Sequence, residues 1–373
     1  MRQDNNHQAF FALLRAGLWE QSVQLVQFQT VSYSEVFRLA EEQSVVGLVA
    51  AGIDHVEDVK VPQEVVLTFV GSALQLEQCN VSMNSFVESL INKLQSEDIS
   101  VILVKGQGIA CCYERPLWRA SGDIDLLLSV SNYNKAKALL VPMASSIEEE
   151  DSHELHLGME IMSWPVELHG TLRSNSLPKM DKVIDEAQHD VFFGGNVRSW
   201  LNGKTQVFLP GVDNDVIFVF SHFIKHFFRG GVGLRQICDW CRLLWTYKDI
   251  LNYGLLESRI RRAGIMSEWK AFASLAVNTL GMPEEAMPLY SSDKKWKRKA
   301  DKILKIILAT GNFGHNSDLS YLNEYGATRR KLTVVLRGSL ENLSHFTIFP
   351  LDSIRAWFHF IVKGIVASVS GKR

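Results

Sequence analysis

The chain has 373 residues, of which 46% are hydrophobic and 21% are charged. This composition is close to the globular average and excludes a disordered, collagen-like or coiled-coil protein. The 39 lysines and arginines nearly balance the 41 aspartates and glutamates, which leaves a formal net charge of −2. Because affinity for nucleic acid depends on many cationic contacts to phosphates, we expect no stable nucleic-acid partner.

The number of cysteines and the N-terminal segment indicate the cellular compartment of the protein. Five cysteines are odd in number and too few for a disulfide framework, which favours a reducing environment. Residues 1–7 lead into a short amphipathic stretch that lacks the apolar core and small-residue cleavage site of a signal peptide. We therefore expect a cytoplasmic protein.

Residues 8–95 have the apolar spacing of helices, as in Phe10, Leu13 and Leu14. Pro62 followed by Gln63 predicts a helix start, because the N–H that proline lacks is not needed in the first turn. The apolar period continues from there to Gln95. This part of the chain is therefore predicted to be helical.

Continuous apolar runs at residues 99–104 and 124–130 are typical of strands buried on both faces. Residues 154–161 and 164–169 predict two more strands with a turn near Ser163, and residues 204–209 predict a last one. Helical patterning returns after residue 211 and continues to the end. We predict an α+β fold in which a core with a small mixed sheet, residues 98–211, is flanked by an N-terminal helical region, 1–97, and a C-terminal helical region, 212–373.

Two aspartates open the second predicted strand. Asp123 and Asp125 lie two residues apart, so on a strand their side chains point to the same face while Ile124 points to the other. Adjacent like charges at the end of a buried strand repel each other, and a site that keeps them usually supplies a cation. Oxygen ligands of this kind suit Mg²⁺ or Mn²⁺. The alternative is a pair of solvated loop carboxylates.

A third carboxylate is available on the strand predicted at residues 164–169. Val166 and Leu168 would face the core, which puts Glu167 and His169 together on the opposite face. If this strand lies beside the strand of the aspartates, three carboxylates converge, which is enough for two metal ions about 4 Å apart.

These residues resemble the polymerase-β-like nucleotidyltransferase superfamily. The resemblance rests on a Lys-Gly turn after a buried strand (105–106), then Ser-Gly-Asp-Ile-Asp-Leu-Leu-Leu (121–128), then Val-Glu-Leu-His (166–169). The chain is most similar to a bacterial branch of largely uncharacterised nucleotidyltransferases. That likeness extends to Leu-Leu-Arg-Ala-Gly-Leu-Trp (13–19) and to the segment 221–240.

The resemblance implies a two-metal nucleotidyltransferase that uses Mg²⁺ or Mn²⁺ and a nucleoside triphosphate. It makes Asp123 and Asp125 the metal-binding pair and Glu167 the third catalytic carboxylate, and it places Gly106 in the turn that faces the phosphates. The chain departs from the family at this turn, because it has Gly-Gln-Gly (106–108) where the superfamily usually has Gly-Ser or Gly-Gly.

Two further groups of side chains complete the expected site. We expect contacts to the nucleotide from Lys105, Gly106, Gln107, Arg119 and Ser121. A lysine meets phosphate as a point charge and an arginine forks onto two oxygens, although both types also occur as solvated or salt-bridged surface cations. The resemblance implies that the acceptor side of the cleft is lined by His169, His226, Arg235 and Asp239.

Alternatives remain open for the second group. Arg235 and Asp239 are four residues apart on a predicted helix and could instead form a structural pair. His222 and His226 have the same spacing, which suits a metal, but no third ligand is evident.

The C-terminal region contains two less specific features. A basic run at residues 294–299 is typical of a solvated helix face, with an acidic partner as the alternative. Residues 354–369 are apolar but interrupted by Arg355, His359 and Lys363, so a membrane span is not predicted. Packing against the helical region is the simpler interpretation, and weak contact of this helix with a membrane surface is the alternative.

We therefore predict metal-dependent transfer of a nucleoside monophosphate to an unidentified hydroxyl or amine, with release of pyrophosphate. The near-neutral charge favours a small molecule, a glycan precursor or a protein as the acceptor. The alternative is a non-catalytic scaffold or membrane-edge module that keeps the fold. A nucleic-acid-modifying transferase would need a basic stripe beside the cleft, for which residues 294–299 are the candidate.

Overall fold

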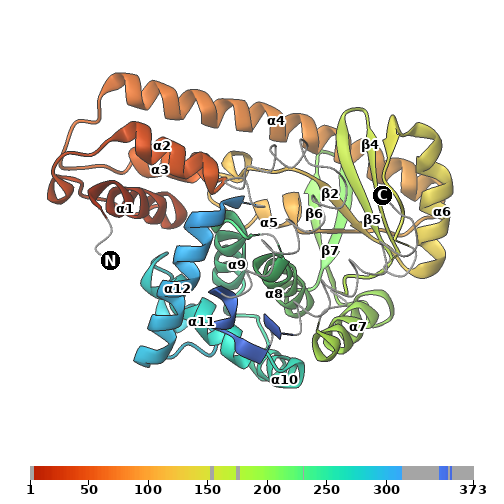
Figure 1. Ribbon diagram of the computed structural model, residues 1–373. Helices are drawn as coiled ribbons and strands as arrows, with labels where there is room; N and C mark the ends of the chain where they lie inside the picture. Colours follow the sequence, from red (N-terminus) through yellow and green to blue (C-terminus); the bar gives the residue numbers. More distant parts are fainter. Residues whose placement is uncertain are drawn as a thin grey trace, which may run out of the picture.

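The computed structural model describes residues 4–151, 155–173, 177–229, 231–312, 344–351 and 353–354. Within these residues the chain begins with packed helices, continues through a mixed sheet with helices between its strands, and returns to packed helices (Figure 1). This order confirms the predicted α+β fold. The division into three regions at residues 97 and 211 stays a prediction.

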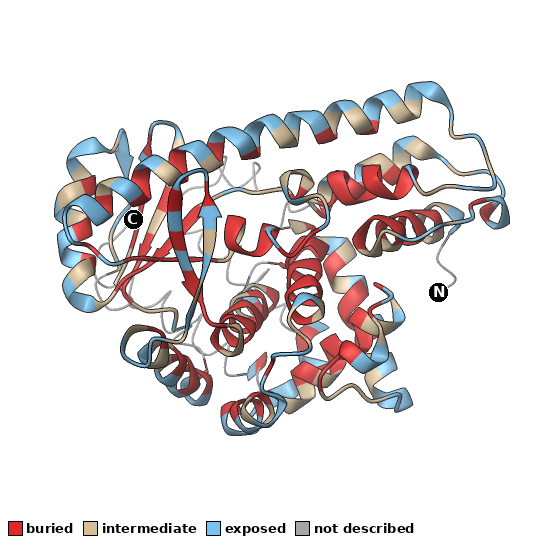
Figure 2. Ribbon diagram, turned by 180° about the vertical axis from the view of Figure 1, so that it is seen from behind, coloured by how far each residue is buried: buried red, intermediate tan, exposed pale blue. Residues whose placement is uncertain are grey.

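The N-terminal helices lead to a long helix that spans the molecule. They are α1 (Asn5–Trp19), α2 (Tyr33–Glu42), α3 (Val46–Ile53) and α4 (Gln63–Ser96). Helix α4 begins directly after Pro62, as predicted. Its outer side is exposed, while its first half packs on α2 through Phe69 and Phe37 and its second half packs on the sheet (Figures 1 and 2).

Helices α1 and α3 cross so closely that only glycine fits at the contact. A Cβ atom on Gly17 would lie 1.8 Å from the carbonyl oxygen of Leu48, and one on Gly52 would lie 2.0 Å from that of Leu13. The two backbones therefore touch, and both glycines are needed for close packing rather than for an unusual φ.

The larger sheet has the strand order β1-β2-β5-β4-β3. Strands β2 and β5 are parallel, and the other neighbours are antiparallel. The strands are β1 (Ile102–Val104), β2 (Ile124–Leu127), β3 (Ser146–Ile147), β4 (His156–Ile161) and β5 (Trp164–His169). Helices α5 (Gly106–Ala110), α6 (Val130–Leu140) and α7 (Pro178–Phe193) follow β1, β2 and β5.

Two strands are shorter than their apolar runs predict. Strand β1 covers only the second half of the run at 99–104. Strand β2 ends at Leu127 because Ser129 caps α6, its Oγ accepting a hydrogen bond from the backbone N–H of Asn132 at 3.4 Å. Val130, predicted to end the strand, is the first residue of that helix.

A second sheet contains a strand that the sequence did not predict. Strands β6 (Val197–Asn202) and β7 (Thr205–Pro210) form a hairpin, of which only β7 was expected. The two-residue turn has Gly203 at φ +59°, which suits a tight hairpin. Strand β6 was missed because most of its side chains are exposed or half-buried, so it lacks a continuous apolar run.

The two faces of the larger sheet differ. One face packs Ile124, Leu126, Val166 and Leu168 against α4 and α6 in one hydrophobic cluster. The alternate residues of the same strands point to the other face, where helix α8 (Val212–Arg229) lies across the end of the sheet (Figure 1). The apolar face therefore fixes the sheet, and the opposite face is free to carry polar side chains.

The C-terminal helices pack around an aromatic centre formed by Phe220, Trp240 and Trp269. They are α8, α9 (Leu234–Thr246), α10 (Tyr253–Ala263), α11 (Met266–Asn278) and α12 (Lys294–Thr310). Their buried side chains belong to the same hydrophobic cluster as those of α1 and α3. The N-terminal and C-terminal helices thus share one core.

The basic run at 294–299 forms the start of α12. The helix predicted at 354–369 lies outside the described residues except for Ile354. No helix among the described residues combines the length and the apolar character required to cross a bilayer.

Candidate active site

The strand register brings the three predicted carboxylates together. Asp125 of β2 is directly paired with Glu167 of the parallel neighbour β5, and Asp123 precedes β2 on the same face as Asp125. Carboxylate oxygens of all three lie within 4.8 Å of one another. The adjacency of the two strands, on which the sequence argument depended, is therefore observed.

Asp125 is the buried centre of this group, with 2% of its surface exposed. Its Oδ1 accepts hydrogen bonds from Lys105 Nζ at 2.7 Å and from His169 Nε2 at 2.8 Å. Burial alone would raise the pKa of Asp125, but the charge of Lys105 and the contact with His169 hold it below its usual value. Asp125 is therefore ionised at neutral pH.

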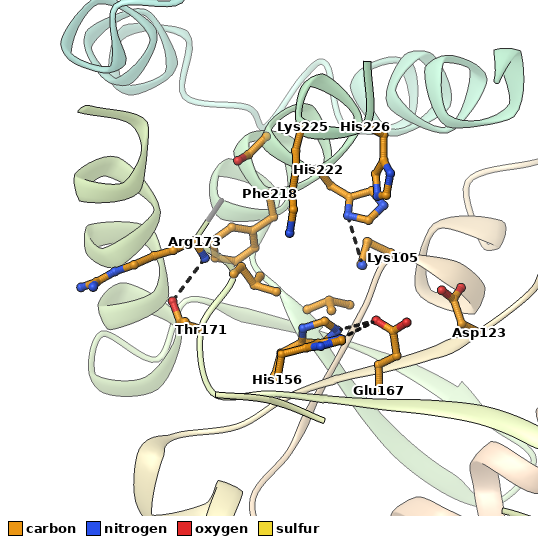
Figure 3. A pocket seen from close by; sticks show the side chains of 14 residues that line it. Lys105, Asp123, His156, Glu167, Thr171, Arg173, Phe218, His222, Lys225 and His226 are labelled. Atoms are coloured by element: carbon orange, nitrogen blue, oxygen red, sulfur yellow. Dashed lines mark hydrogen bonds and ion pairs between the residues drawn. The ribbon is translucent and has the colours of Figure 1, made fainter. Parts of the chain in front are cut away.

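The two outer carboxylates have opposite environments. The negative charge of Asp125, followed by burial, raises the pKa of Asp123. Burial also acts to raise the pKa of Glu167, but hydrogen bonds from His156 and His169 lower it overall. Repulsion between the carboxylates is thus strongest at Asp123, which lies on the side of the group away from His156 (Figure 3).

Lys105 enters the site from a strained position. It follows β1 with φ +58° and ψ −145°, a sparsely populated backbone region that costs a residue with a Cβ about 1–3 kcal/mol. Its ammonium group bonds Asp125 and also donates to Nδ1 of His222 on α8 at 3.3 Å. Burial acts to lower the pKa of Lys105, but the charge of Asp125 raises it overall, so Lys105 stays protonated.

A pocket opens between this face of the sheet and α8 (Figure 3). Its volume is about 270 Å³. The sheet side supplies Asp123, Glu167, Lys105 and two histidines, with Asp125 buried behind them. Helix α8 supplies Phe218, His222, Lys225 and His226, which face them across the opening (Figure 3). The carboxylates therefore lie on the sheet wall of the pocket only, whereas nitrogen-bearing side chains lie on both walls.

The α8 histidines are neutral at physiological pH. Burial, followed by the positive charge of Lys105, lowers the pKa of His222 well below its usual value. The same two causes lower the pKa of His226 to about 4. Their ring centroids lie 4.5 Å apart. His222 can therefore accept the hydrogen bond from Lys105, because its Nδ1 carries no proton in the required tautomer.

His156 is a site residue that sequence analysis missed. It begins β4 and is directly paired with His169 of β5, so the two rings share a face with centroids 4.9 Å apart. A signal was available: if the predicted strands join through the two residues 162–163, position 156 must oppose position 169. Phe218, Lys225 and Thr171 also line the pocket without having been predicted.

The Gly-Gln-Gly turn is explained by packing. Gly106 has φ +40°, and a Cβ on Gly108 would lie 2.7 Å from a methyl carbon of Leu209 on β7. The side chain of Gln107 is buried and donates from Nε2 to Oδ1 of Asn80 on α4 at 2.9 Å. Gln107 thus points to α4, away from the pocket, while Lys105 lies in the pocket.

Arg119 and Asp239 form a buried ion pair. The guanidinium donates from Nε and Nη2 to the two carboxylate oxygens of Asp239, at 2.9 and 2.7 Å, and from Nη1 to Ser121 Oγ at 3.1 Å. Arg235 donates to the carbonyl oxygen of Ala120 at 3.0 Å. In the described part of the chain, the residues lining the pocket include His169 and His226 but not this group.

The carboxylate group fits a divalent metal ion. Asp123, Asp125 and Glu167 supply the oxygen donors that Mg²⁺ and Mn²⁺ prefer, and they converge at one side of an open pocket. The raised pKa of Asp123 reflects uncompensated negative charge, which a bound cation would relieve.

Comparison with known proteins agrees with this geometry. The family described as uncharacterised nucleotidyltransferase matches residues 29–281, which is more than half of the chain and includes every residue of the carboxylate group. Searches of curated proteins and of solved structures gave no significant match. The chain therefore belongs to this nucleotidyltransferase family, whose activity is nucleotidyl transfer.

Proposed function

We propose that the chain transfers a nucleoside monophosphate from a nucleoside triphosphate to a hydroxyl or amine acceptor, in a metal-dependent reaction that releases pyrophosphate. The observation that carries this proposal is the convergence of Asp123, Asp125 and Glu167 from two adjacent strands, with Asp123 and Glu167 lining an open pocket.

Asp123, Asp125 and Glu167 would hold the divalent ions, Mg²⁺ or Mn²⁺, of a two-metal enzyme. Bound there, the metal would neutralise triphosphate charge and stabilise the departing pyrophosphate. This role is supported by Glu167 and Asp125 staying ionised at neutral pH, since the pKa of each is below its usual value.

Lys105 is the chain's own cation for the phosphates. Its Nζ lies between Asp125 and His222, inside the pocket. A lysine interacts with phosphate as a point charge, so Lys105 can exchange its carboxylate partner for a phosphate oxygen when nucleotide enters. Lys225 lines the opposite wall of the pocket and supplies a second cation.

The reaction needs one bond made and one broken. An acceptor oxygen or nitrogen attacks the α-phosphorus, and the bond from that phosphorus to the oxygen bridging the β-phosphorus breaks. Its electron pair leaves with pyrophosphate. The acceptor's proton passes to the carboxylate of Glu167 or Asp125, and from there to solvent.

The acceptor side would include His169 and His226, which line the same pocket. Phe218 and Thr171 add an aromatic face and a hydroxyl to this end of the pocket. Such a lining suits a compact polar acceptor such as a small molecule, a glycan precursor or a protein side chain.

Analysis of the products by phosphorus NMR tests this function. The protein is incubated with each of the four nucleoside triphosphates, Mg²⁺ or Mn²⁺, and mixtures of small alcohols and amines. We expect pyrophosphate to form with one nucleotide, and the rate to fall at least about 100-fold in Asp125→Asn. Asp301→Asn, the same change at an exposed position on α12, serves as control. Orthophosphate in place of pyrophosphate would contradict nucleotidyl transfer.

A further inference from the structure

A second group of metal-ligating side chains lies beside the carboxylates. It consists of His156, Glu167 and His169, whose ligand atoms all lie within 4.8 Å of one another. We propose that these three residues form a separate site for a divalent transition metal ion such as Zn²⁺ or Co²⁺. The proposal does not depend on nucleotidyl transfer, although Glu167 belongs to both donor sets.

The pairing of strands β4 and β5 fixes the relative positions of these three residues. His156 and His169 are directly opposed on antiparallel strands, and Glu167 lies two residues from His169, so all three side chains leave the same face. Nε2 of His156 contacts Oε2 of Glu167 (Figure 3). Nε2 of His169 lies between the same oxygen and Oδ1 of Asp125, its nearer contact at 2.8 Å. Three donors are thus aimed at one small region of the pocket.

The distances match those between ligands of a bound ion. Nε2 of His156 and of His169 lie 3.2 and 3.3 Å from Oε2 of Glu167. Bonds of about 2.0–2.2 Å to a transition ion place neighbouring ligand atoms about 3.0–3.5 Å apart in tetrahedral or octahedral geometry. Two of the three distances between ligand atoms therefore match a bound ion already, and the third, between the two Nε2 atoms, is at most 4.8 Å.

The donor set determines which ion fits. Two imidazole nitrogens and one carboxylate suit Zn²⁺, Co²⁺ or Mn²⁺, whereas Mg²⁺ prefers oxygen ligands and keeps its waters. All three residues line the pocket, so water or substrate can complete the coordination shell. This open arrangement, with three protein ligands, is typical of catalytic rather than structural zinc sites.

Titration with Co²⁺ in the presence of excess Mg²⁺ and without nucleotide tests the proposal. We expect one Co²⁺ to bind per chain with visible d–d absorption. In His156→Ala the affinity should fall by more than the roughly 10- to 100-fold that loss of an outer-shell partner costs. His189→Ala, the same change at an exposed histidine on α7, should bind Co²⁺ normally. No visible band, or one that survives in His156→Ala, would overturn the proposal.

Two further variants separate this site from the carboxylate group and from effects on folding. Asp123→Asn should keep the Co²⁺ spectrum, because Asp123 is not in the histidine group, whatever it does to nucleotide binding. His156→Cys should give a new sulfur-to-cobalt charge-transfer band, which only direct ligation produces. Absence of that band in the folded variant, or displacement of Co²⁺ by Mg²⁺, would overturn the proposal independently of the chain's transferase activity.

Discussion

Lys105 is the residue on which the charge balance of the site depends. Three carboxylates converge on a largely buried face, and Lys105 provides a permanent positive charge within 2.7 Å of the most buried one. Burying an unpaired charge is costly, so the lysine allows Asp125 to remain ionised before any ion arrives. Its strained backbone is consistent with a functional position.

Lys105→Met should destabilise the metal-free protein by about 3–5 kcal/mol, because it leaves the buried carboxylate of Asp125 without its cation. Added Mg²⁺ should restore part of this loss by supplying positive charge. Urea unfolding with and without Mg²⁺ measures both effects.

The matched control is Lys137→Met, which removes the more exposed ion pair with Glu150 and should cost about 1 kcal/mol or less. Equal losses in the two variants would contradict the role given to Lys105.

For single residues, the sequence predicted those positions that depend only on neighbours along the chain. The face shared by Asp123 and Asp125 follows from the two-residue period of a strand, and Glu167 follows from the same rule. The partner of Arg119 does not follow from any local rule, because Asp239 is 120 residues away and meets it only through the packing of α9. Sequence reasoning therefore did not foresee this pair, and the roles expected of the two residues at the nucleotide and at the acceptor stay predictions.

Helix α8 forms the wall opposite the carboxylates, and it presents histidines that are held neutral. The pKa of His226 is about 4 in the folded protein because of burial and the nearby positive charge of Lys105. In the unfolded chain a histidine titrates near pH 6.5. Between these values the unfolded state binds the proton and the folded state does not, so stability falls as the pH falls from about 6.5 to 4.

We therefore expect the wild-type protein to lose about 2 kcal/mol more stability than His226→Gln when the pH is lowered from 7 to 5. Urea unfolding midpoints at the two pH values measure the difference. His189→Gln, at an exposed position, should follow the wild type. The same pH dependence in His226→Gln as in the wild type would show that His226 is not held neutral.

The crossing of α1 and α3 gives a second prediction for the elements. Gly52→Ala should cost about 3 kcal/mol, because the new methyl group would lie 2.0 Å from the carbonyl oxygen of Leu13 and force the helices apart. Gly71→Ala, on α4 with open space around it, should instead stabilise by about 0.5–1 kcal/mol. Thermal unfolding measures both changes, and a harmless Gly52→Ala would contradict the close crossing.

Elements with a strong apolar period were predictable, and those shaped by exposure or capping were not. Helix α4 and strand β5 begin where the pattern indicates. Strand β6 has mostly exposed or half-buried side chains and so leaves no such pattern. The end of β2 is decided by Ser129, whose capping of α6 outweighs the apolar character of the residues around it.

In the whole molecule, the site lies where the sheet meets the C-terminal helices. The sheet is fixed from behind by α4 and α6, and α8 is fixed by the core that the N-terminal and C-terminal helices share. The two walls of the pocket are thus held by two hydrophobic clusters, and Ile102, Val104 and Leu127 of the sheet also belong to the cluster that holds α8. This arrangement places Asp123, Glu167 and Lys105 on one side of a space open to solvent and the neutral histidines and Lys225 of α8 on the other (Figure 3).

Calorimetric titration of the four nucleoside triphosphates, with and without Mg²⁺ or Mn²⁺, tests the central claim most directly. The wild-type protein should bind one of the four nucleoside triphosphates, and it should do so only when the metal is present. Asp123→Asn and Asp125→Asn should remain folded and lose this binding, and Asp301→Asn should keep it. Metal-independent binding, or binding that survives both substitutions in the carboxylate group, would contradict the account.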